Sequence, residues 1–459
     1  MIVTKLRLLH RLKAILPRGE LDLSPQTLKK YASDKWFAAQ QPDAVALPRS
    51  VKSISAILGF AYRHRIPVTA RGAGHGYVGG CVPVYGGIVL SLERMSRIRE
   101  INAADFVVVV EPGVVTEKLQ EAVERRGLFY PPDPASRANN FIGGNIATNA
   151  GGPRCLKYGV TRDYVLGLEV VLANGTVIRL GGRTHKNKTG FDLARLFVGS
   201  EGLLGIITEA TLKLIPLPPF RACLAVGFDS MRNAVHALQA VLAAGFLPSA
   251  LELADEFTLA AAYQRTGSRR LRGCRAHLII ELDGQEKSVR YELPVLANIV
   301  RRQKPLFLEP GLGAARCEEI WKIRREFSYA LRDTGLTKLN EDIVVPRSHL
   351  ADLFRFAAGL QKKHGLPIAC FGHAGDGNIH TNVMVDFNRA GAARRAEAAL
   401  DELFAQVIAW GGAISGEHGI GLAKKRWWPR AVSPELRELH RVVKQALDPR
   451  NILNPGKFV

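Results

Sequence analysis

The chain has 459 residues, 47% hydrophobic and 23% charged, a balance typical of soluble globular proteins with two or three domains. The formal charge of +21 comes from lysines and arginines spread along the chain, without a basic block interleaved with aromatics, so no nucleic-acid binding is predicted. The six cysteines form no CxxC pair and have no regular spacing, a pattern that predicts no cysteine-bound iron–sulfur or zinc cluster in this chain and favours a reducing cytoplasm. No apolar run of about eighteen residues appears, so no membrane span is predicted.

The N-terminal residues predict a short basic amphipathic helix. Ile2, Leu6, Leu9, Leu12 and Leu16 recur at helical spacing, and basic residues interrupt any signal-peptide-like apolar stretch. We expect this helix to pack on its own domain. A peripheral contact with the inner face of a membrane is the alternative use of such a helix.

The next part of the chain alternates strands and helices. Residues 43–71 read as strand, helix and strand, and a glycine-rich loop follows them. A helix is predicted from Thr116, and Gly127 ends it in the left-handed conformation. Residues 166–180 and 205–217 each read as a hairpin, and the first turns at an Asn-Gly pair.

Prolines 216, 218 and 219 mark the clearest domain boundary in the chain. Beyond them, to about residue 410, strands and helices alternate in a pattern that predicts an antiparallel sheet with helices on one side. The expected segments are an N-terminal helical part, a first domain, a second domain and a C-terminal segment, with bounds 1–40, 41–219, 220–410 and 411–459.

Two glycine-rich segments predict a site for a large, flat, phosphorylated ligand. Gly74, Gly76 and Gly79 match the dinucleotide-binding fingerprint by letter, but the residues after them read as loop and strand rather than helix, so a Rossmann site is not expected. A loop whose amide N–H groups surround a diphosphate is the alternative. Residues 142–152 are also rich in glycine and amide side chains, and a turn-rich linker is the competing interpretation.

A polar cluster near the C-terminal end predicts a metal site. His373 and His380 flank the turn AGDGN, so a hairpin would place the two imidazoles face to face. Glu417 and His418 lie in a second glycine-flanked loop, where both side chains can turn inward. Two histidines and one carboxylate leave an open coordination position, as in catalytic metal sites. The competing interpretation is a strand with ordinary hydrogen-bonded histidines.

Seven ordered motifs resemble one known family. They are RGAGHGYVGG, PPDPAS, IGGNIATNAGG, FVGSEGLLGIITEATLKL, FGHAGDGNIH, SGEHGIG and DPRNILNPGKFV. Together, over residues 40–459, they resemble the FAD-linked 2-hydroxyacid dehydrogenases of the vanillyl-alcohol-oxidase superfamily, the group of glycolate oxidase catalytic subunits, D-lactate dehydrogenases and D-2-hydroxyglutarate dehydrogenases. The resemblance implies an α+β fold, with a two-part FAD-binding domain of the PCMH type and an α+β cap domain of antiparallel sheet covered by helices.

The resemblance implies FAD as cofactor and assigns its contacts residue by residue. The implied cofactor-binding residues are Arg71, Gly72, Ala73, Gly74, His75, Gly76, Pro132, Ser136, Gly143, Asn145, Thr148, Asn149, Gly151, Glu201, Gly205, Ile207 and Asn454. His75 is a departure, because the group commonly has threonine there, whereas relatives with covalently attached FAD have histidine. His75 therefore either attaches FAD or lines the loop.

The resemblance also implies a reaction. His373, His380 and Glu417 match the ligands of a divalent metal, zinc or manganese, His418 matches the base, and Arg324 and Asn382 match contacts of the substrate carboxylate. The implied reaction oxidises a small D-2-hydroxy acid, of the D-lactate or glycolate type, to the 2-oxo acid, with hydride transfer to flavin N5. Near residue 340 some relatives have a lysine or tyrosine that selects the substrate tail, and the asparagine here argues against large dicarboxylates.

Electrons would then leave to a separate acceptor: an iron–sulfur partner subunit, a quinone, a cytochrome, oxygen or an electron-transfer flavoprotein. Two other functions are open at this point. A metal-dependent hydrolase would use His373, His380 and Glu417 with an activated water, and a non-catalytic flavin-binding subunit would need no base.

Overall fold

The computed structural model describes residues 2–459, with all their side chains except those of residues 2–6 and 269. The chain divides into two compact units. Unit 1 comprises Met1–Ala150, Val160–Leu217 and Glu417–Val459, and unit 2 comprises Gly151–Gly159 and Pro218–Gly416.

The first sheet of unit 1 has four strands in the order β1-β2-β4-β3. The strands are β1 (Leu21–Asp22), β2 (Ala44–Ala46), β3 (Val68–Arg71) and β4 (Ile88–Ser91). Both β2 and β3 run parallel to β4, and α3 (Val51–His64) connects β2 to β3. The Ser53 N–H donates to the Ser50 side chain at the start of α3, and Arg65 ends the helix in the left-handed region. The strand–helix–strand prediction for residues 43–71 is confirmed.

The N-terminal helix α1 (Ile2–Ile15) packs on unit 1. Leu9, Leu12 and Leu16 are buried in the core around the first sheet. The side chains of Ile2 and Leu6, which belong to the same predicted apolar face, lie outside the described ones. The described residues of this apolar face therefore pack within their own unit. Among the described helices, none is both long enough and apolar enough to cross a membrane.

The second sheet of unit 1 is antiparallel, in the order β5-β6-β10-β8-β9. Its strands are β5 (Ile98–Asn102), β6 (Val107–Val110), β8 (Val165–Val171), β9 (Val177–Gly181) and β10 (Ile206–Lys213). The β8–β9 hairpin turns at Asn174-Gly175 as predicted, with Gly175 at φ +90°. The predicted hairpin over 205–217 is wrong: β10 pairs with β6 and β8, and β11 (Ile215–Pro216) pairs with β7 (Leu128–Phe129).

Short helices and the C-terminal segment complete unit 1. The helices are α2 (Pro25–Lys30), α4 (Thr116–Glu124), α5 (Ile142–Thr148), η1 (Thr161–Asp163), α7 (Leu193–Phe197), α14 (Trp428–Ala431) and α15 (Pro434–Leu447). Gly127 adopts φ +71° just beyond α4, as predicted. In α15 the buried ammonium of Lys444 donates to the carbonyls of Leu203 and Leu453 and to Asp448 Oδ2 at 2.7–2.8 Å, which ties the C-terminal segment to its unit.

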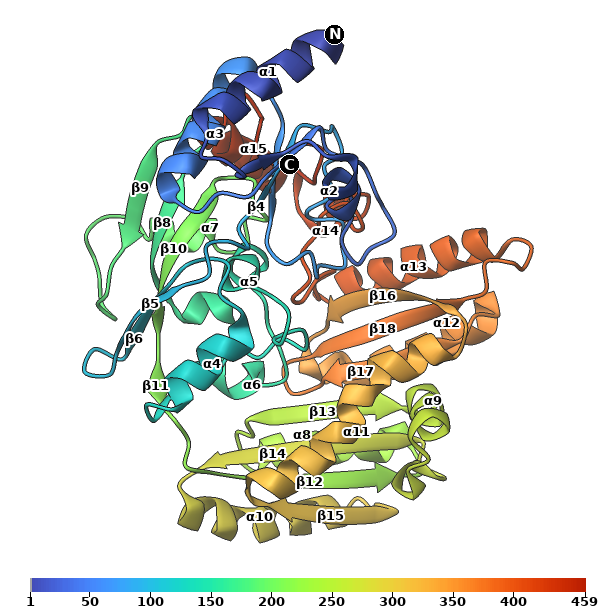
Figure 1. Ribbon diagram of the computed structural model, residues 1–459. Helices are drawn as coiled ribbons and strands as arrows, with labels where there is room; N and C mark the ends of the chain where they lie inside the picture. Colours follow the sequence, from blue (N-terminus) through green and yellow to red (C-terminus); the bar gives the residue numbers. More distant parts are fainter. Residues whose placement is uncertain (1) are drawn as a thin grey trace. The chain divides into compact units, whose positions relative to one another are not determined.

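Unit 2 is built on a seven-stranded antiparallel sheet in the order β15-β12-β14-β13-β17-β18-β16 (Figure 1). Its strands are β12 (Phe220–Phe228), β13 (Ala250–Asp255), β14 (Ala276–Gly284), β15 (Phe307–Leu312), β16 (Thr337–Val344), β17 (Ile368–His373) and β18 (Asn378–Val385). Its helices are α6 (Cys155–Tyr158), α8 (Met231–Ala243), α9 (Glu256–Thr266), η2 (Arg269–Leu271), α10 (Glu286–Arg301), α11 (Gly313–Asp333), η3 (Arg347–His349), α12 (Leu350–His364) and α13 (Ala392–Ala409).

Helices cover both faces of this sheet, not one as the pattern predicts. Successive side chains of β12 point to opposite faces, and Cys223, Leu224, Ala225 and Val226 are all buried. Cys223 and Ala225 pack against α11, which crosses one face in Figure 1. Helices α8 and α10 also pack on β12 and β14. The continuous apolar run of β12 is the sequence signal of a strand covered on both faces, and the prediction of helices on one side did not use it.

Candidate active site

The two glycine-rich segments lie against each other in unit 1. The loop from Gly72 leads into β4 with no helix between them, so the Rossmann interpretation stays excluded. A Cβ on Gly72 would lie 3.5 Å from the Gly144 Cα, which shows how closely the loop approaches α5. A Cβ on Gly144 itself would meet nothing within 4 Å, so open space adjoins the backbone there. Both segments thus present bare backbone at one place.

A loop and the C-terminal tail meet the same region of unit 1. The Glu201 N–H donates to the Ala147 carbonyl at 2.8 Å, and the Asn454 Nδ2 donates to the Glu201 and Gly80 carbonyls at 2.8 and 2.9 Å. The Glu201 carboxylate accepts the N–H groups of Ile420 and Gly421. The side chain of Asn454 is 1% exposed. Hydrogen bonds therefore connect the tail, the Glu201 loop and the glycine loop.

The polar atoms of several residues predicted to touch the cofactor make hydrogen bonds within unit 1. The bonds run from Arg71 Nη1 to Ser33 O, Lys35 N to Gly76 O, Gln120 Nε2 to Pro132 O, Asn140 Nδ2 to Ser136 Oγ, Asn145 Nδ2 to Thr116 Oγ1, Thr148 Oγ1 to Gly144 O, and Arg162 N to Asn149 Oδ1. Any ligand contact from these residues would therefore use their backbone or their remaining atoms.

Packing and backbone conformation account for other residues of the predicted cofactor-binding set. A Cβ on Gly143 would lie 2.6 Å from the Pro112 Cβ, and one on Gly205 would lie 2.5 Å from the Val170 Cγ1. Ile207 is buried in β10 opposite Val170. Gly74 has φ +71°, and a Cβ there would strike the Arg71 guanidinium. Ala73 adjoins Gly74 in the loop, and Gly151 belongs to unit 2.

In unit 2, β17 and β18 form the predicted hairpin around AGDGN. The rings of His373 and His380 lie 5.5 Å apart between centroids and meet edge to face. Both side chains are more than nine-tenths buried. The hairpin therefore brings the two imidazoles together, as its turn predicts.

Glu252 of β13 is a functional candidate that the sequence analysis missed. Its Oε1 lies 2.5 Å from the His373 Nδ1, and its Oε2 accepts from the Arg324 Nε at 2.5 Å. Burial alone would raise the pKa of Glu252, but Arg324 and His373 outweigh it and lower the pKa to about 2. A metal bound to His373 would then use Nε2, with the Nδ1 held by a carboxylate. The available signal was a single glutamate in the apolar strand ALELAD.

Asp342 of β16 is a second missed residue. It is fully buried, its Oδ1 accepts from the Asn378 Nδ2, and its Oδ2 accepts from the Ser415 Oγ and the Gly416 N–H. These bonds fasten the chain that leads into Glu417 to the β17–β18 hairpin. His373 and His380 belong to unit 2, and Glu417 is the first residue of the last segment of unit 1. Within unit 2 the hairpin brings the two histidines together, and Asp342 holds Ser415 and Gly416, directly before Glu417.

The other predicted catalytic residues have defined surroundings. The Arg324 guanidinium lies over the Phe371 ring, 4.9 Å from its centroid, and its Nε is already engaged, so a bidentate substrate contact would use the terminal nitrogens. Asn382 is fully buried, and its Nδ2 donates to the carbonyls of Ala369 and His380. The His418 ring lies 5.3 Å from that of Tyr77, both in unit 1.

Comparison with known proteins identifies the family of this chain. Residues 42–181 match the family described as FAD binding domain, and residues 217–458 match the family described as FAD linked oxidases, C-terminal domain. The glycolate oxidase subunit GlcD of Bacillus subtilis (strain 168) is 40% identical over 91% of this chain and 89% of its own length. The chain belongs to the FAD-linked oxidases.

Other relatives agree with this FAD-linked oxidase assignment. A D-lactate dehydrogenase of Anaerostipes hadrus is 32% identical over 98% of the chain and 97% of its own length. The solved structure of p-cresol methylhydroxylase with substrate bound has a TM-score of 0.80 at 20% identity, over 98% of this chain and 96% of that one, which shows a shared fold. The predicted family, α+β fold class, FAD cofactor and oxidoreductase class are confirmed.

The residues of unit 1 fit a bound flavin. Among the residues predicted to touch the cofactor, two have a buried polar atom without a hydrogen-bond partner in the described structure: His75 Nδ1 and Asn454 Oδ1. Burial, with Lys35 nearby, lowers the pKa of His75, which favours the neutral imidazole. Buried polar atoms of this kind are normally satisfied, and a ligand rich in acceptors and donors would satisfy them.

Proposed function

We propose that this FAD-linked oxidase oxidises a small D-2-hydroxy acid, of the D-lactate or glycolate type, to the 2-oxo acid. The buried chain Arg324–Glu252–His373 carries the proposal, since one carboxylate holds a guanidinium and an imidazole on its two oxygens. A 2-hydroxy acid has a carboxylate and, on the neighbouring carbon, a hydroxyl. Its carboxylate can pair with the guanidinium of Arg324, and its hydroxyl can bind a metal held by the imidazole of His373. The names of the relatives, glycolate oxidase subunit and D-lactate dehydrogenase, support the same substrate class.

Each residue then has a role in the proposed reaction. The terminal nitrogens of Arg324 bind the substrate carboxylate. His373, His380 and Glu417 would hold zinc or manganese, which supplies Lewis-acid polarisation of the substrate hydroxyl. His418 accepts the hydroxyl proton as general base. Bound FAD supplies the acceptor for the hydride of C2.

The electrons leave to a separate acceptor in this proposal. An iron–sulfur partner subunit, a quinone, a cytochrome, oxygen or an electron-transfer flavoprotein each suits a two-electron donor of this kind. Turnover with an artificial electron acceptor, compared with turnover under air alone, separates oxygen from the other acceptors.

Anaerobic titration of the purified holoenzyme tests the proposal. We expect D-lactate or glycolate to bleach the visible flavin absorption, and L-lactate to bleach it far more slowly. The variant His418→Ala should retain FAD but reduce the bleaching rate at least about a hundredfold, as loss of a general base does. A chelator should slow the wild-type reaction, and added Zn²⁺ or Mn²⁺ should restore it.

Other outcomes would overturn parts of the proposal. Bleaching that survives chelation with no metal bound would remove the metal from the reaction. A protein that binds FAD, is not bleached by any 2-hydroxy acid and is unaffected by His418→Ala would be a flavin-binding subunit. Hydrolysis of an ester or amide by metal-loaded protein without FAD would favour the hydrolase alternative.

A further inference from the structure

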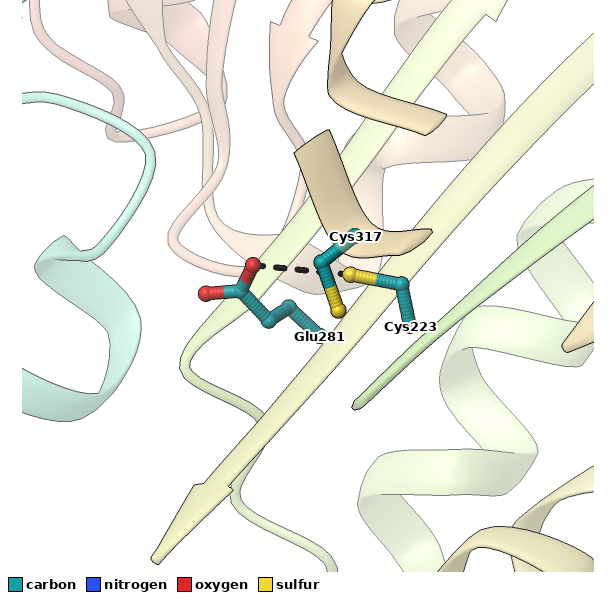
Figure 2. A group of neighbouring side chains, drawn as sticks. All are labelled: Cys223, Glu281 and Cys317. Carbon is teal, nitrogen blue, oxygen red and sulfur yellow. Dashed lines mark hydrogen bonds between the residues drawn. The ribbon is translucent and has the colours of Figure 1, made fainter. Parts of the chain in front are cut away.

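A second group of metal-binding side chains lies in unit 2, apart from the histidine hairpin. Figure 2 shows Cys223, Glu281 and Cys317 turned toward one another. Cys223 and Cys317 are fully buried and Glu281 is 1% exposed. One ligand atom of each lies within 4.8 Å of the other two. The absence of a CxxC pair predicts no cysteine-bound zinc site, so this group departs from the sequence prediction: its cysteines are 94 positions apart and only the fold brings them together.

The fold explains why the three residues meet. Cys223 and Glu281 are directly opposite each other in β12 and β14, so their side chains share one face of the sheet. On its other side Cys223 faces Gly311 of β15. A Cβ on Gly311 would lie 2.8 Å from the Ile320 Cδ1 and 3.3 Å from the Arg316 carbonyl oxygen, so the absence of a side chain there favours the close approach of α11. Cys317, in the second turn of α11, is thereby placed beside the strand pair.

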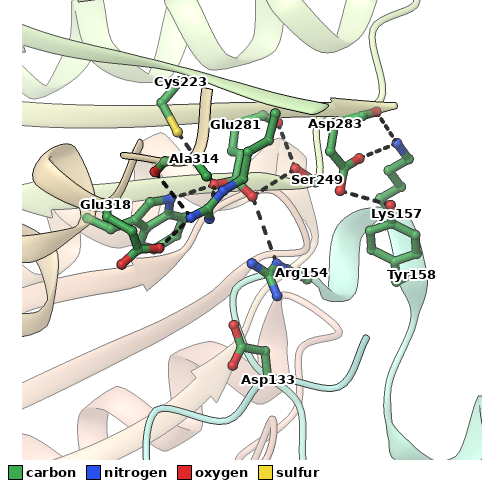
Figure 3. A network of polar contacts seen from close by, with 12 residues as sticks. Asp133, Arg154, Lys157, Tyr158, Cys223, Ser249, Glu281, Asp283, Ala314 and Glu318 are labelled. Atoms are coloured by element: carbon green, nitrogen blue, oxygen red, sulfur yellow. Dashed lines mark hydrogen bonds and ion pairs between the residues drawn. The ribbon is translucent and has the colours of Figure 1, made fainter. Parts of the chain in front are cut away.

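Neighbouring groups already orient the Glu281 carboxylate. Its Oε2 accepts from the Trp321 Nε1 at 2.7 Å, and its Oε1 accepts from the Ser249 Oγ at 3.2 Å. Arg221 lies 3.4 Å from it. Arg154 lies 3.8 Å from it, as Figure 3 shows. Ligating carboxylates in metal sites are held by hydrogen bonds of this kind.

We propose that Cys223, Cys317 and Glu281 form a closed, structural zinc site. Tetrahedral zinc, with Zn–S of about 2.3 Å and Zn–O of about 2.0 Å, sets sulfur and oxygen about 3.5 Å apart. The Cys223 Sγ lies 3.4 Å from the Glu281 Oε2 without any adjustment. The Gly311 carbonyl, 3.7 Å from the Cys317 Sγ, supplies the fourth ligand and closes the site.

The charges of the site are compatible with zinc. On binding, Zn²⁺ forms one bond to each sulfur, and each thiol releases its proton to solvent, so two protons leave as two positive charges enter. No electron is transferred. The buried network therefore keeps its net charge, and the guanidinium groups of Arg221 and Arg154 still balance Glu281. Bound zinc would clamp α11 to β12 and β14.

X-ray absorption at the zinc edge tests the site in the wild-type holoenzyme prepared with Zn²⁺. We expect a sulfur shell at about 2.3 Å, which the His373, His380 and Glu417 group cannot produce. The double variant Cys223→Ser/Cys317→Ser should lose that shell and about one zinc per chain. Cys274→Ser, at another buried cysteine of unit 2, should retain both.

The test is independent of the proposed function. His373→Ala/His380→Ala should abolish metal-dependent turnover and leave the sulfur shell unchanged. Absence of sulfur around zinc in the wild-type protein would overturn the proposal even if the Cys→Ser variants failed to fold. Mass spectrometry under non-reducing conditions that finds a Cys223–Cys317 disulfide would overturn it as well.

Discussion

Glu252 shows what one buried residue contributes to the candidate active site. A carboxylate with 1% exposure is costly unless it is paired, and here both of its oxygens are used, one by His373 and one by Arg324. The same two contacts fix which nitrogen of His373 is available and hold the guanidinium over Phe371. Glu252 is therefore a positioning residue for both predicted groups.

We expect Glu252→Gln to weaken metal binding at the histidine hairpin by about 10- to 100-fold, because His373 loses the charged partner that orients it. The measurement is the dissociation constant for Mn²⁺, by titration of metal-free holoenzyme. Glu256→Gln changes an exposed carboxylate at the adjoining end of α9 and should bind Mn²⁺ as the wild type does. Unchanged Mn²⁺ affinity in Glu252→Gln would contradict a positioning role.

At the scale of elements, the loop at Gly72 and the helix α5 approach each other closely through their glycines. Gly143 and Gly144 are neighbours in sequence but have different surroundings. A side chain at 143 would strike Pro112, whereas one at 144 would enter open space. The first glycine therefore serves packing, and the second leaves room for a ligand.

We expect Gly143→Ala to destabilise the protein by about 1–3 kcal/mol, since its Cβ overlaps Pro112. Gly144→Ala should be as stable as the wild type or more so, because alanine favours a helix, yet bind FAD more weakly. Urea unfolding of the FAD-free proteins and FAD titration measure the two effects. If Gly144→Ala binds FAD with wild-type affinity, the open space there is not part of the flavin site.

At the scale of the whole molecule, unit 1 is assembled from distant parts of the chain, and Lys444 fastens the last of them. Its ammonium reaches two carbonyls and Asp448, whose side chain is fully buried and also accepts the N–H groups of Ile452 and Leu453. This cluster sets the course of the tail that brings Asn454 to the Glu201 loop.

We expect Lys444→Met to destabilise unit 1 by about 3–5 kcal/mol, because Asp448 is left as a buried, unpaired charge. The tail should loosen, and FAD should be lost during gel filtration. Thermal unfolding and the flavin-to-protein ratio measure both effects. Adding Asp448→Asn should recover part of the loss, and Lys425→Met, at an exposed site, should change little. Full FAD retention in Lys444→Met would show that the tail does not depend on this cluster.

The amino-acid sequence by itself determined the family, the FAD cofactor, the β8–β9 and β17–β18 hairpins, and the helix α3. These depend on local signals: ordered motifs, glycine turns and periodic apolar residues act over a few residues of chain. Only the tertiary structure decided the second helix layer of unit 2 and the partners of β10. It also decided the contacts of Glu252 and Asp342 and the proximity of Cys223, Glu281 and Cys317. Those contacts join residues tens to hundreds of positions apart, and a buried carboxylate or thiol has no sequence signature until the sheet register places its partner beside it.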